Sequence, residues 1–510
     1  MEQKCLKTSV YLNDTVYSDS VEQPIDVDFS LPDFCPDISK IFKCRAVPRI
    51  SSKGIEGKII TIEGSVCITL LYADKEGNLC SYEYMYPFVK TVEMPTESAG
   101  ANLCCKYKCE YINFRAVTGR KIDIHGAVGI YLKVFKRKCT DIISDYDDCN
   151  IELRRGTAPA TIPMGYAEKF LLLEEEIRIG QGQPCIRNML RCDANTCIKE
   201  TKVINDKAVV KGELTVSILY CPEGGGKPQC VKAVIPFSQI VDVEGITEIC
   251  RCDTKSEIAF LEIKPRVSGS GEAKSFSLAS KILLTCQAYC VNDVAVVLDA
   301  YSRKYKADIK RNNVNFEKII ANISEVYHCK KSVELDEDIT SVIDMWCNVK
   351  SSSTKFENGN MIICGTLMAG MILCNENDNA IYYEKPIDFE YKYPVNCESG
   401  MPHSEPQLEI ISCNYTITSP NNIELHIELG VNAAVYEKQE MSLISDMSLD
   451  ETALLERKDK SAMRVYFCGG NECIWDIARL HNASVEEIMH INNLDSENLP
   501  AGKMILIPVM

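Results

Sequence analysis

A block of alternating apolar residues occurs three times in this chain of 510 residues, at a spacing of roughly 150 residues. The three copies are Ile59–Tyr72, Ala208–Tyr220 and Met361–Cys374. Each copy runs into a turn rich in glycine or asparagine, and a second alternating stretch follows. This pattern predicts a long antiparallel hairpin. Because the period is far longer than that of a solenoid repeat, it predicts separate β-rich domains in tandem.

One glycine stands at the same point of each copy, at Gly64, Gly212 and Gly365. A glycine inside a strand indicates a β-bulge or a close approach of another backbone. The second strand of each hairpin carries a proline, at Pro87-Phe88, Pro236-Phe237 and Pro386.

Further segments recur around these hairpins. A short lead-in precedes each first strand (31–41, 180–190 and 338–345), and its length predicts one or two helical turns. A second alternating block follows each hairpin, at 111–135, 260–289 and 408–436. The predicted fold class is therefore mainly β, with three tandem β-rich domains at 1–155, 156–307 and 308–437. The charged, Gly- and Pro-free stretch 438–462 predicts an exposed, partly helical linker.

The last segment, 463–510, has a different pattern. Val465 and Phe467 indicate a short strand, and apolar spacing over 474–480 predicts a helix. Ser484 with Glu487 forms a capping box for a second helix over 485–490. The apolar run 504–507 predicts a closing strand. The order is β-α-α-β.

Composition narrows the function. A net charge of −16 argues against binding to nucleic acid. The N-terminus lacks the apolar core of a secretory signal, so we expect a protein that is not secreted. Since no apolar stretch is long enough to span a membrane, we also expect no membrane insertion. The 27 cysteines, without paired CxxC spacing, are interpreted as reduced, mostly buried thiols. Catalytic residues, a metal site and cofactors are not predicted, so we expect no enzyme.

The C-terminal pattern, with the phrases Ile474–Ala478, Asn492–Leu494 and Leu506–Pro508, resembles a LysM domain. The phrases GSVCITLLY, GELTVSILY and GTLMAGMILC, the lead-in LPDFCPDISKI and the phrase VVLDAYS, followed by LysM, resemble the SPOCS-domain family of spore-forming Firmicutes. The resemblance implies a non-enzymatic scaffold of spore coat assembly. It implies a place in the mother-cell cytoplasm, at the outer forespore membrane surface. The implied partners are other coat proteins and the coat basement-layer ATPase SpoIVA, which the LysM domain would bind.

LysM domains that bind N-acetylglucosamine polymers hold the sugar between two loops, here 468–473 and 492–502. The usual first-loop phrase Gly-Asp-Thr-Leu is replaced by Gly470-Asn471-Glu472-Cys473, which removes a hydroxyl and adds a charge. This favours a protein partner over a sugar. The alternative is a peptidoglycan-binding protein of the spore or cell wall, and weak glycan binding stays open as a second property.

Either ligand would contact the same predicted site. The candidate residues are Gly470, Asn471, Glu472, Ile474, Trp475, Ile488, Met489, Asn492, Asn493 and Leu494. Two of them also have a purely structural interpretation. Trp475 lies between core positions, and Asn471 is suited to cap the first helix.

Overall fold

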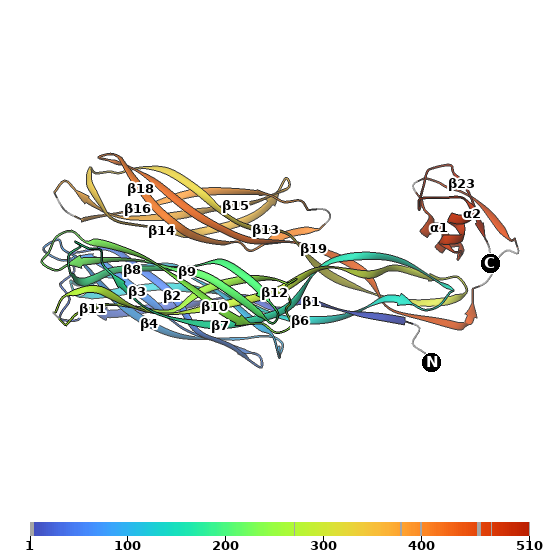
Figure 1. The fold of residues 1–510 in the computed structure, drawn as a ribbon, viewed down its shortest axis with the longest axis horizontal. Coiled ribbons are helices and arrows are strands. Elements are labelled where there is room, and N and C mark those ends of the chain that lie inside the picture. Colours follow the sequence, from blue (N-terminus) through green and yellow to red (C-terminus); the bar gives the residue numbers. More distant parts are fainter. Residues whose placement is uncertain are drawn as a thin grey trace.

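The computed structural model describes residues 5–269, 271–377, 380–397, 400–455, 461–470 and 472–508. It is mainly β, as predicted, and helices occur only in the C-terminal segment of the described residues. Three units with the same strand order precede that segment (Figure 1).

Each unit contains two antiparallel sheets. Unit 1 comprises β1 (Cys5–Ser30), β2 (Lys40–Glu56), β3 (Ile59–Ala73), β4 (Leu79–Glu93), β5 (Asn102–Ala116) and β6 (Lys121–Tyr146). One sheet has the order β1-β6-β5, and the other has the order β2-β3-β4.

Units 2 and 3 repeat this arrangement. Unit 2 comprises β7 (Ile151–Arg178), β8 (Ile186–Ile204), β9 (Lys207–Pro222), β10 (Gln229–Asp242), β11 (Arg251–Val267) and β12 (Ala273–Ser302). Unit 3 comprises β13 (Tyr305–Glu334), β14 (Ile339–Glu357), β15 (Asn360–Asn375), β16 (Ala380–Pro394), β17 (Met401–Ser404), β18 (Gln407–Ser419) and β19 (Asn422–Leu454). The two sheets of unit 2 have the orders β7-β12-β11 and β8-β9-β10. In unit 3, one sheet contains β13 and β19, with β17 and β18 also paired to β19, and the other has the order β14-β15-β16.

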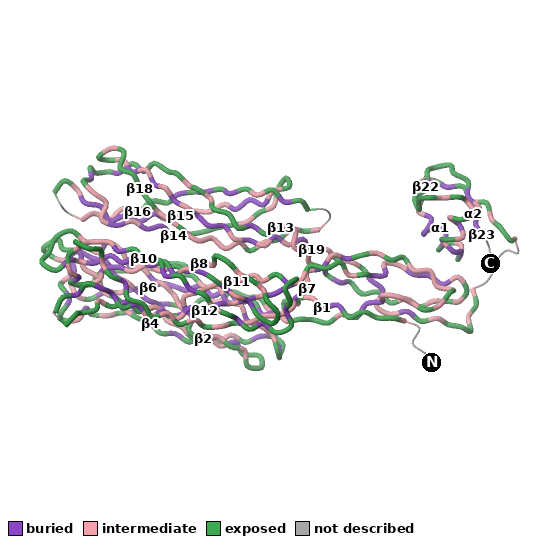
Figure 2. The backbone as a smooth tube through the Cα atoms, in the orientation of Figure 1, coloured by how far each residue is buried: buried purple, intermediate pink, exposed green. Residues whose placement is uncertain are grey.

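The core of each unit lies between its two sheets, where alternate residues of facing strands meet. In unit 1, Ile60, Ile62, Val66 and Ile68 of β3 belong to one buried cluster with residues of β6. Figure 2 shows buried positions (purple) along the strands of the units, interspersed with intermediate and exposed ones. The period-two pattern therefore directs one face of each strand inward, as the sequence predicts.

The three recurring glycines confirm both expectations for their position. A Cβ on Gly212 would lie 2.6 Å from the Cys197 carbonyl oxygen and 2.5 Å from the Phe237 ring, and Gly64 and Gly365 are confined in the same way. In units 1 and 2 the neighbouring strand is also bulged directly beside the partner of the glycine, and in unit 3 the bulge lies nearby, between the partners of Leu367 and Thr366. The aromatic ring across each glycine fills the space that a side chain would take.

The proline of the third copy is not the counterpart of the other two. Gly64 pairs with Phe88 and Gly212 with Phe237, whereas Gly365 pairs with Phe389. Pro386 pairs with Met368 instead. The ring position is therefore retained in unit 3, while the proline is displaced along the strand.

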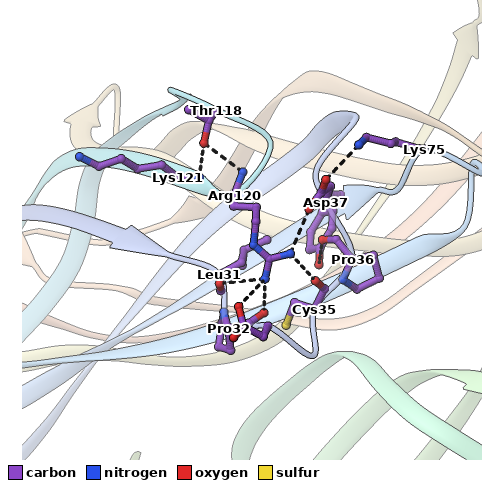
Figure 3. Close-up of polar contacts among 11 residues, drawn as sticks. Leu31, Pro32, Cys35, Pro36, Asp37, Lys75, Thr118, Arg120 and Lys121 are labelled. Carbon is purple, nitrogen blue, oxygen red and sulfur yellow. Dashed lines mark hydrogen bonds and ion pairs between the residues drawn. The ribbon is translucent and has the colours of Figure 1, made fainter.

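The helical turns predicted before each first strand are absent from the described lead-ins. In unit 1 the Arg120 guanidinium donates to the carbonyl oxygens of Leu31, Pro32 and Cys35 and to the Asp37 carboxylate (Figure 3). Prolines lack the N–H that a helix needs, and the side chain of Arg120 takes the carbonyls that a helix would use. The lead-in is consequently a loop clamped by one arginine.

A second bond holds the same loop and recurs in unit 2. The Tyr72 hydroxyl donates to the Pro36 carbonyl at 3.2 Å, and the Tyr220 hydroxyl donates to the Pro184 carbonyl at 3.1 Å. Both tyrosines are fully buried. The tyrosine that ends the first hairpin strand thus ties the lead-in to the core.

The three units also share a long extension, here called the stalk, formed by residues 5–16, 135–146, 151–162, 290–302, 305–316 and 439–454. Its core joins Val10 and Ile142 of unit 1, Val296 of unit 2, and Phe316 and Leu443 of unit 3. Figure 1 shows the paired strands projecting together from the units.

The stalk corrects the prediction of a linker over 438–462. Residues up to Leu454 belong to β19 and pair with β13, and Leu443, Ile444 and Met447 are buried. Pairing and burial of this apolar set outweigh the helical propensity of the charged residues between them. Residues 456–460 lie outside the described residues.

A cluster of charged residues lies where the three units meet, and two of them, Arg191 and Asp344, are buried. Lys43, Arg191 and Asp344 occupy the same register position, opposite Leu71, Leu219 and Ile372 respectively. Arg191 donates to the Asp344 carboxylate and pairs with Asp193, and its guanidinium lies 4.0 Å from the centre of the Trp346 ring. Three copies of one fold therefore contact each other through side chains that differ from copy to copy.

Candidate functional site

The C-terminal segment folds as predicted into a β-α-α-β module. β20 (Met463–Phe467) pairs antiparallel with β23 (Met504–Pro508), and α1 (Ile474–His481) and α2 (Val485–Ile491) lie between them in sequence. Ser484 caps α2 by accepting a hydrogen bond from the Glu487 backbone N–H, as the capping box predicts. Short strands β21 (Glu472–Cys473) and β22 (Asn498–Leu499) join the two loops.

The first candidate loop is closed on itself. The Glu472 carboxylate accepts from the Tyr466 hydroxyl at 3.1 Å and from the Gly469 N–H at 3.0 Å. Gly470 adopts a φ of 127°, which side chains rarely tolerate. Asn471 lies outside the described residues. The charge that replaces the usual threonine therefore stabilises the loop itself.

The second candidate loop is tied to the first and to the core. The Ile474 N–H donates to the Glu497 carbonyl at 2.8 Å, so backbone atoms of the two loops contact each other directly. The Asn492 side chain donates to the carbonyls of Ile488 and Leu506 and accepts from the Leu506 N–H at 2.7 Å. Asn492 thus joins α2 to β23. Asn493, the next candidate residue in this loop, is exposed and so accessible to a ligand.

The apolar candidates belong mostly to the core of the module. Ile474 and Ile488 are fully buried, and Met489 and Leu494 are half-buried against the same cluster. These four side chains stabilise the module. Ile474 and Ile488 cannot offer a surface to a ligand.

Trp475 is buried for a different reason, because it packs against the stalk. Its ring makes an edge contact with Tyr301, with centres 5.0 Å apart, and its Nε1–H donates to the Asp299 carboxylate at 2.9 Å. Arg479 donates to the same carboxylate at 2.6 Å. Burial opposes ionisation of Asp299, but the bonds from Trp475 and Arg479 outweigh it and hold the pKa of that carboxyl below its ordinary value.

Further contacts complete this interface. The Tyr301 hydroxyl donates to the Ala483 carbonyl at 2.7 Å, and Arg303 lies 3.9 Å from the Glu487 carboxylate. Asp299 and Tyr301 lie at the end of β12 and Arg303 follows it directly, at the tip of the stalk beside the module (Figure 1). The turn between α1 and α2 is thereby docked on the protein's own stalk.

Sequence reasoning did not find this interface. The phrase VVLDAYS (296–302) serves there only as part of the family resemblance, although it carries Asp299 and Tyr301. The only sign of a contact in the sequence is an acidic residue and a tyrosine at the end of an apolar strand. Trp475, which Asp299 contacts, lies 176 residues further along the chain.

Family comparisons agree with this architecture. A model described as the SPOCS domain of SipL matches residues 37–117 and 185–265, and a LysM-domain model matches residues 471–508. The chain matches a SipL-like SPOCS and LysM protein. The SPOCS matches cover β2–β5 of unit 1 and β8–β11 of unit 2. No curated protein and no solved structure matches the chain.

This domain content indicates a protein related to the spore coat and to sporulation. The matched families are non-catalytic. The LysM domain points to glycan binding, and the SPOCS domains point to interaction with coat proteins. Among the residues that the structure describes, no helix has both the length and the apolar character needed to span a bilayer.

Proposed function

We propose that this SipL-like chain is a non-enzymatic scaffold of spore coat assembly, located at the outer forespore membrane surface in the mother-cell cytoplasm. The three tandem units form its body, and the LysM domain docks to a SpoIVA-like coat ATPase. The proposal rests on which surfaces of the LysM domain are free to bind a partner. Its sugar-loop residues bond to one another, while a separate apolar face is open.

That face is the outer side of the LysM sheet, formed by Met463, Val465, Phe467 and Met504. Each of these side chains is at least half exposed, Phe467 most of all at 67%. The pairing of Phe467 with Met504 places them side by side on two adjacent strands. Exposed apolar residues gathered in this way are typical of protein interaction sites. The face also lies on the sheet, whereas the stalk contacts come from α1, Ala483 and α2.

Co-purification of the full chain with the SpoIVA-like ATPase tests this proposal. We expect Val465→Lys combined with Phe467→Lys to abolish co-purification. Leu480→Lys is the matched control, since Leu480 is a 70% exposed apolar residue of the same module on α1. Retention of the partner by the double variant, or equal loss in the control, would refute the proposed surface.

A glycan-binding function remains the second candidate, because the LysM match points to it. Retention of the full chain on chitin beads or purified spore cortex tests it directly. Retention that persists in the double lysine variant would assign the sugar to the loops. A fluorescent fusion that encircles the developing forespore would support the proposed location, and diffuse fluorescence would contradict it.

A further inference from the structure

Two cysteines of unit 2 lie in direct contact across the β11–β12 hairpin. The register pairs Arg251 with Tyr289, so Cys250 faces Cys290 one step beyond the last paired residues. Their Sγ atoms are 2.7 Å apart. A disulfide has a length of about 2.05 Å, so a movement of well under 1 Å would join them.

The surroundings of Cys250 favour its thiolate. The Thr247 N–H donates to Cys250 Sγ at 3.5 Å, and the Thr247 hydroxyl lies 3.7 Å from the same atom. Burial raises the pKa of Cys250, but the hydrogen bonds from Cys290 and Thr247 outweigh burial, and the pKa falls below its ordinary value. The thiolate is the nucleophilic form of cysteine.

A solvent route reaches this pair. Cys250 lines a cavity of about 950 Å³ between the three units, together with Lys133 of unit 1, Tyr289 of unit 2 and Glu405 of unit 3. Cys290 is partly exposed. A small polar oxidant can therefore approach Cys250 without unfolding of the hairpin.

The fold itself does not require the two thiols. In unit 1 the register pairs Asn102 with Phe135, so Ala101 and Lys136 occupy the corresponding positions. The same hairpin end is thus built with an alanine and a lysine. The cysteine pair is a property of unit 2 that packing alone does not explain.

We propose that Cys250 and Cys290 form a reversible intramolecular disulfide, with hydrogen peroxide as the oxidant. Cys250 thiolate attacks one peroxide oxygen, which forms an S–O bond, breaks the O–O bond and releases hydroxide that leaves as water after taking up a proton. Cys290 sulfur then attacks the sulfenic sulfur, which forms the S–S bond and releases a second water. Two thiols lose two electrons and two protons in total, and the peroxide receives both.

The disulfide closes a covalent loop between residues 40 positions apart. It joins the turn before β11 to the middle of β12, near the point where β12 continues into the stalk. Oxidation would therefore fasten the wall of the central cavity to the strand that also carries the LysM contacts.

Peptide mapping of the intact protein tests the proposal. The chain is treated with a small excess of hydrogen peroxide, alkylated, and digested with trypsin. Cleavage after Arg251 separates Cys250, in peptide 233–251, from Cys252. Further cleavage after Tyr289 by chymotrypsin separates Cys286 from Cys290. Chymotrypsin also cuts after Phe237, which leaves Cys250 in fragment 238–251. We expect this fragment joined to the Cys290 fragment and a loss of two titratable thiols, both reversed by dithiothreitol.

Cys252, the nearest other thiol in the sequence, provides the control. Cys252→Ser should retain the cross-link, whereas Cys250→Ser and Cys290→Ser should remove it. Recovery of the Cys250 fragment in alkylated, unlinked form from the oxidised wild-type chain would overturn the proposal. A cross-link from Cys250 to Cys286 would overturn it as well.

Discussion

Replacing Asp299 by alanine should release the LysM domain from the stalk. Asp299 accepts from Trp475 and Arg479 of the LysM domain, and its side chain is only 13% exposed. The Trp475 N–H is buried, so the loss of its acceptor should cost about 1–3 kcal/mol. Arg479 is 54% exposed, so its ion pair adds only about 0.2–1 kcal/mol.

These contributions sum to about 1–4 kcal/mol, or roughly a ten- to thousandfold shift of the docking equilibrium toward release. Tryptophan emission is a suitable assay because the chain has two tryptophans. Trp346 stays in the charged cluster between the units, whereas Trp475 becomes exposed. We therefore expect a shift of the emission to longer wavelength in Asp299→Ala and a smaller shift in Asp299→Asn, whose amide oxygen still accepts from Trp475.

Asp145→Ala is the control, because Asp145 pairs with Arg155 within the stalk at 2.7 Å. Equal emission from wild type and Asp299→Ala would refute the reasoning, and so would an equal shift in the control. The pH dependence gives a further check. Because the pKa of Asp299 is lowered, its contribution to docking is complete above the ordinary carboxyl value of about 3.9 and is lost as the pH falls below that value.

Three further perturbations test the units themselves. Gly212→Ala forces a Cβ against a carbonyl oxygen and an aromatic ring, so it should lower the free energy of unfolding by about 1–3 kcal/mol in a urea titration. Gly54 is the control, because it is a strand position with open space, and Gly54→Ala should change this free energy little. Arg120→Ala should increase hydrogen exchange of the unit 1 lead-in, and unchanged exchange would contradict its role as a clamp. Arg191→Met should lower the free energy of unfolding by about 3–5 kcal/mol, because it leaves the buried Asp344 carboxylate without its ion-pair partner. Adding Asp344→Leu should restore most of that stability, as measured by thermal unfolding.

Local pattern predicted the elements well where each residue's environment is set by its neighbours in sequence. Alternation located the hairpins, and the strand glycines indicated bulges that occur in all three units. Helical spacing and the Ser484 cap located both helices of the LysM domain. These features depend on the backbone and on contacts a few residues apart, so they can be read from one sequence.

The errors arose where distant segments compete with local propensity. Residues 438–454 have helical propensity, but β13 pairs with them and buries Leu443 and Ile444. Pro386 suggested the wrong counterpart in the third hairpin, because the ring that covers Gly365 comes from Phe389. Neither outcome can be inferred without knowing the strand register.

The candidate site shows the same division. Sequence identified the LysM fold and the unusual Glu472, but it could not show that this carboxylate bonds to Tyr466 and Gly469. Nor could it show that Trp475 binds Asp299, 176 residues earlier in the chain. Both interactions depend on where folding places side chains in space.

By itself, the sequence determined three β-rich copies followed by a β-α-α-β module, because alternation, strand glycines and helix caps act over a few residues. Only the tertiary structure decided which surfaces remain free. Burial against another unit or the stalk depends on contacts between segments far apart in the chain. For that reason, the outer face of the LysM sheet, and not the predicted loop residues, became the surface proposed for a partner.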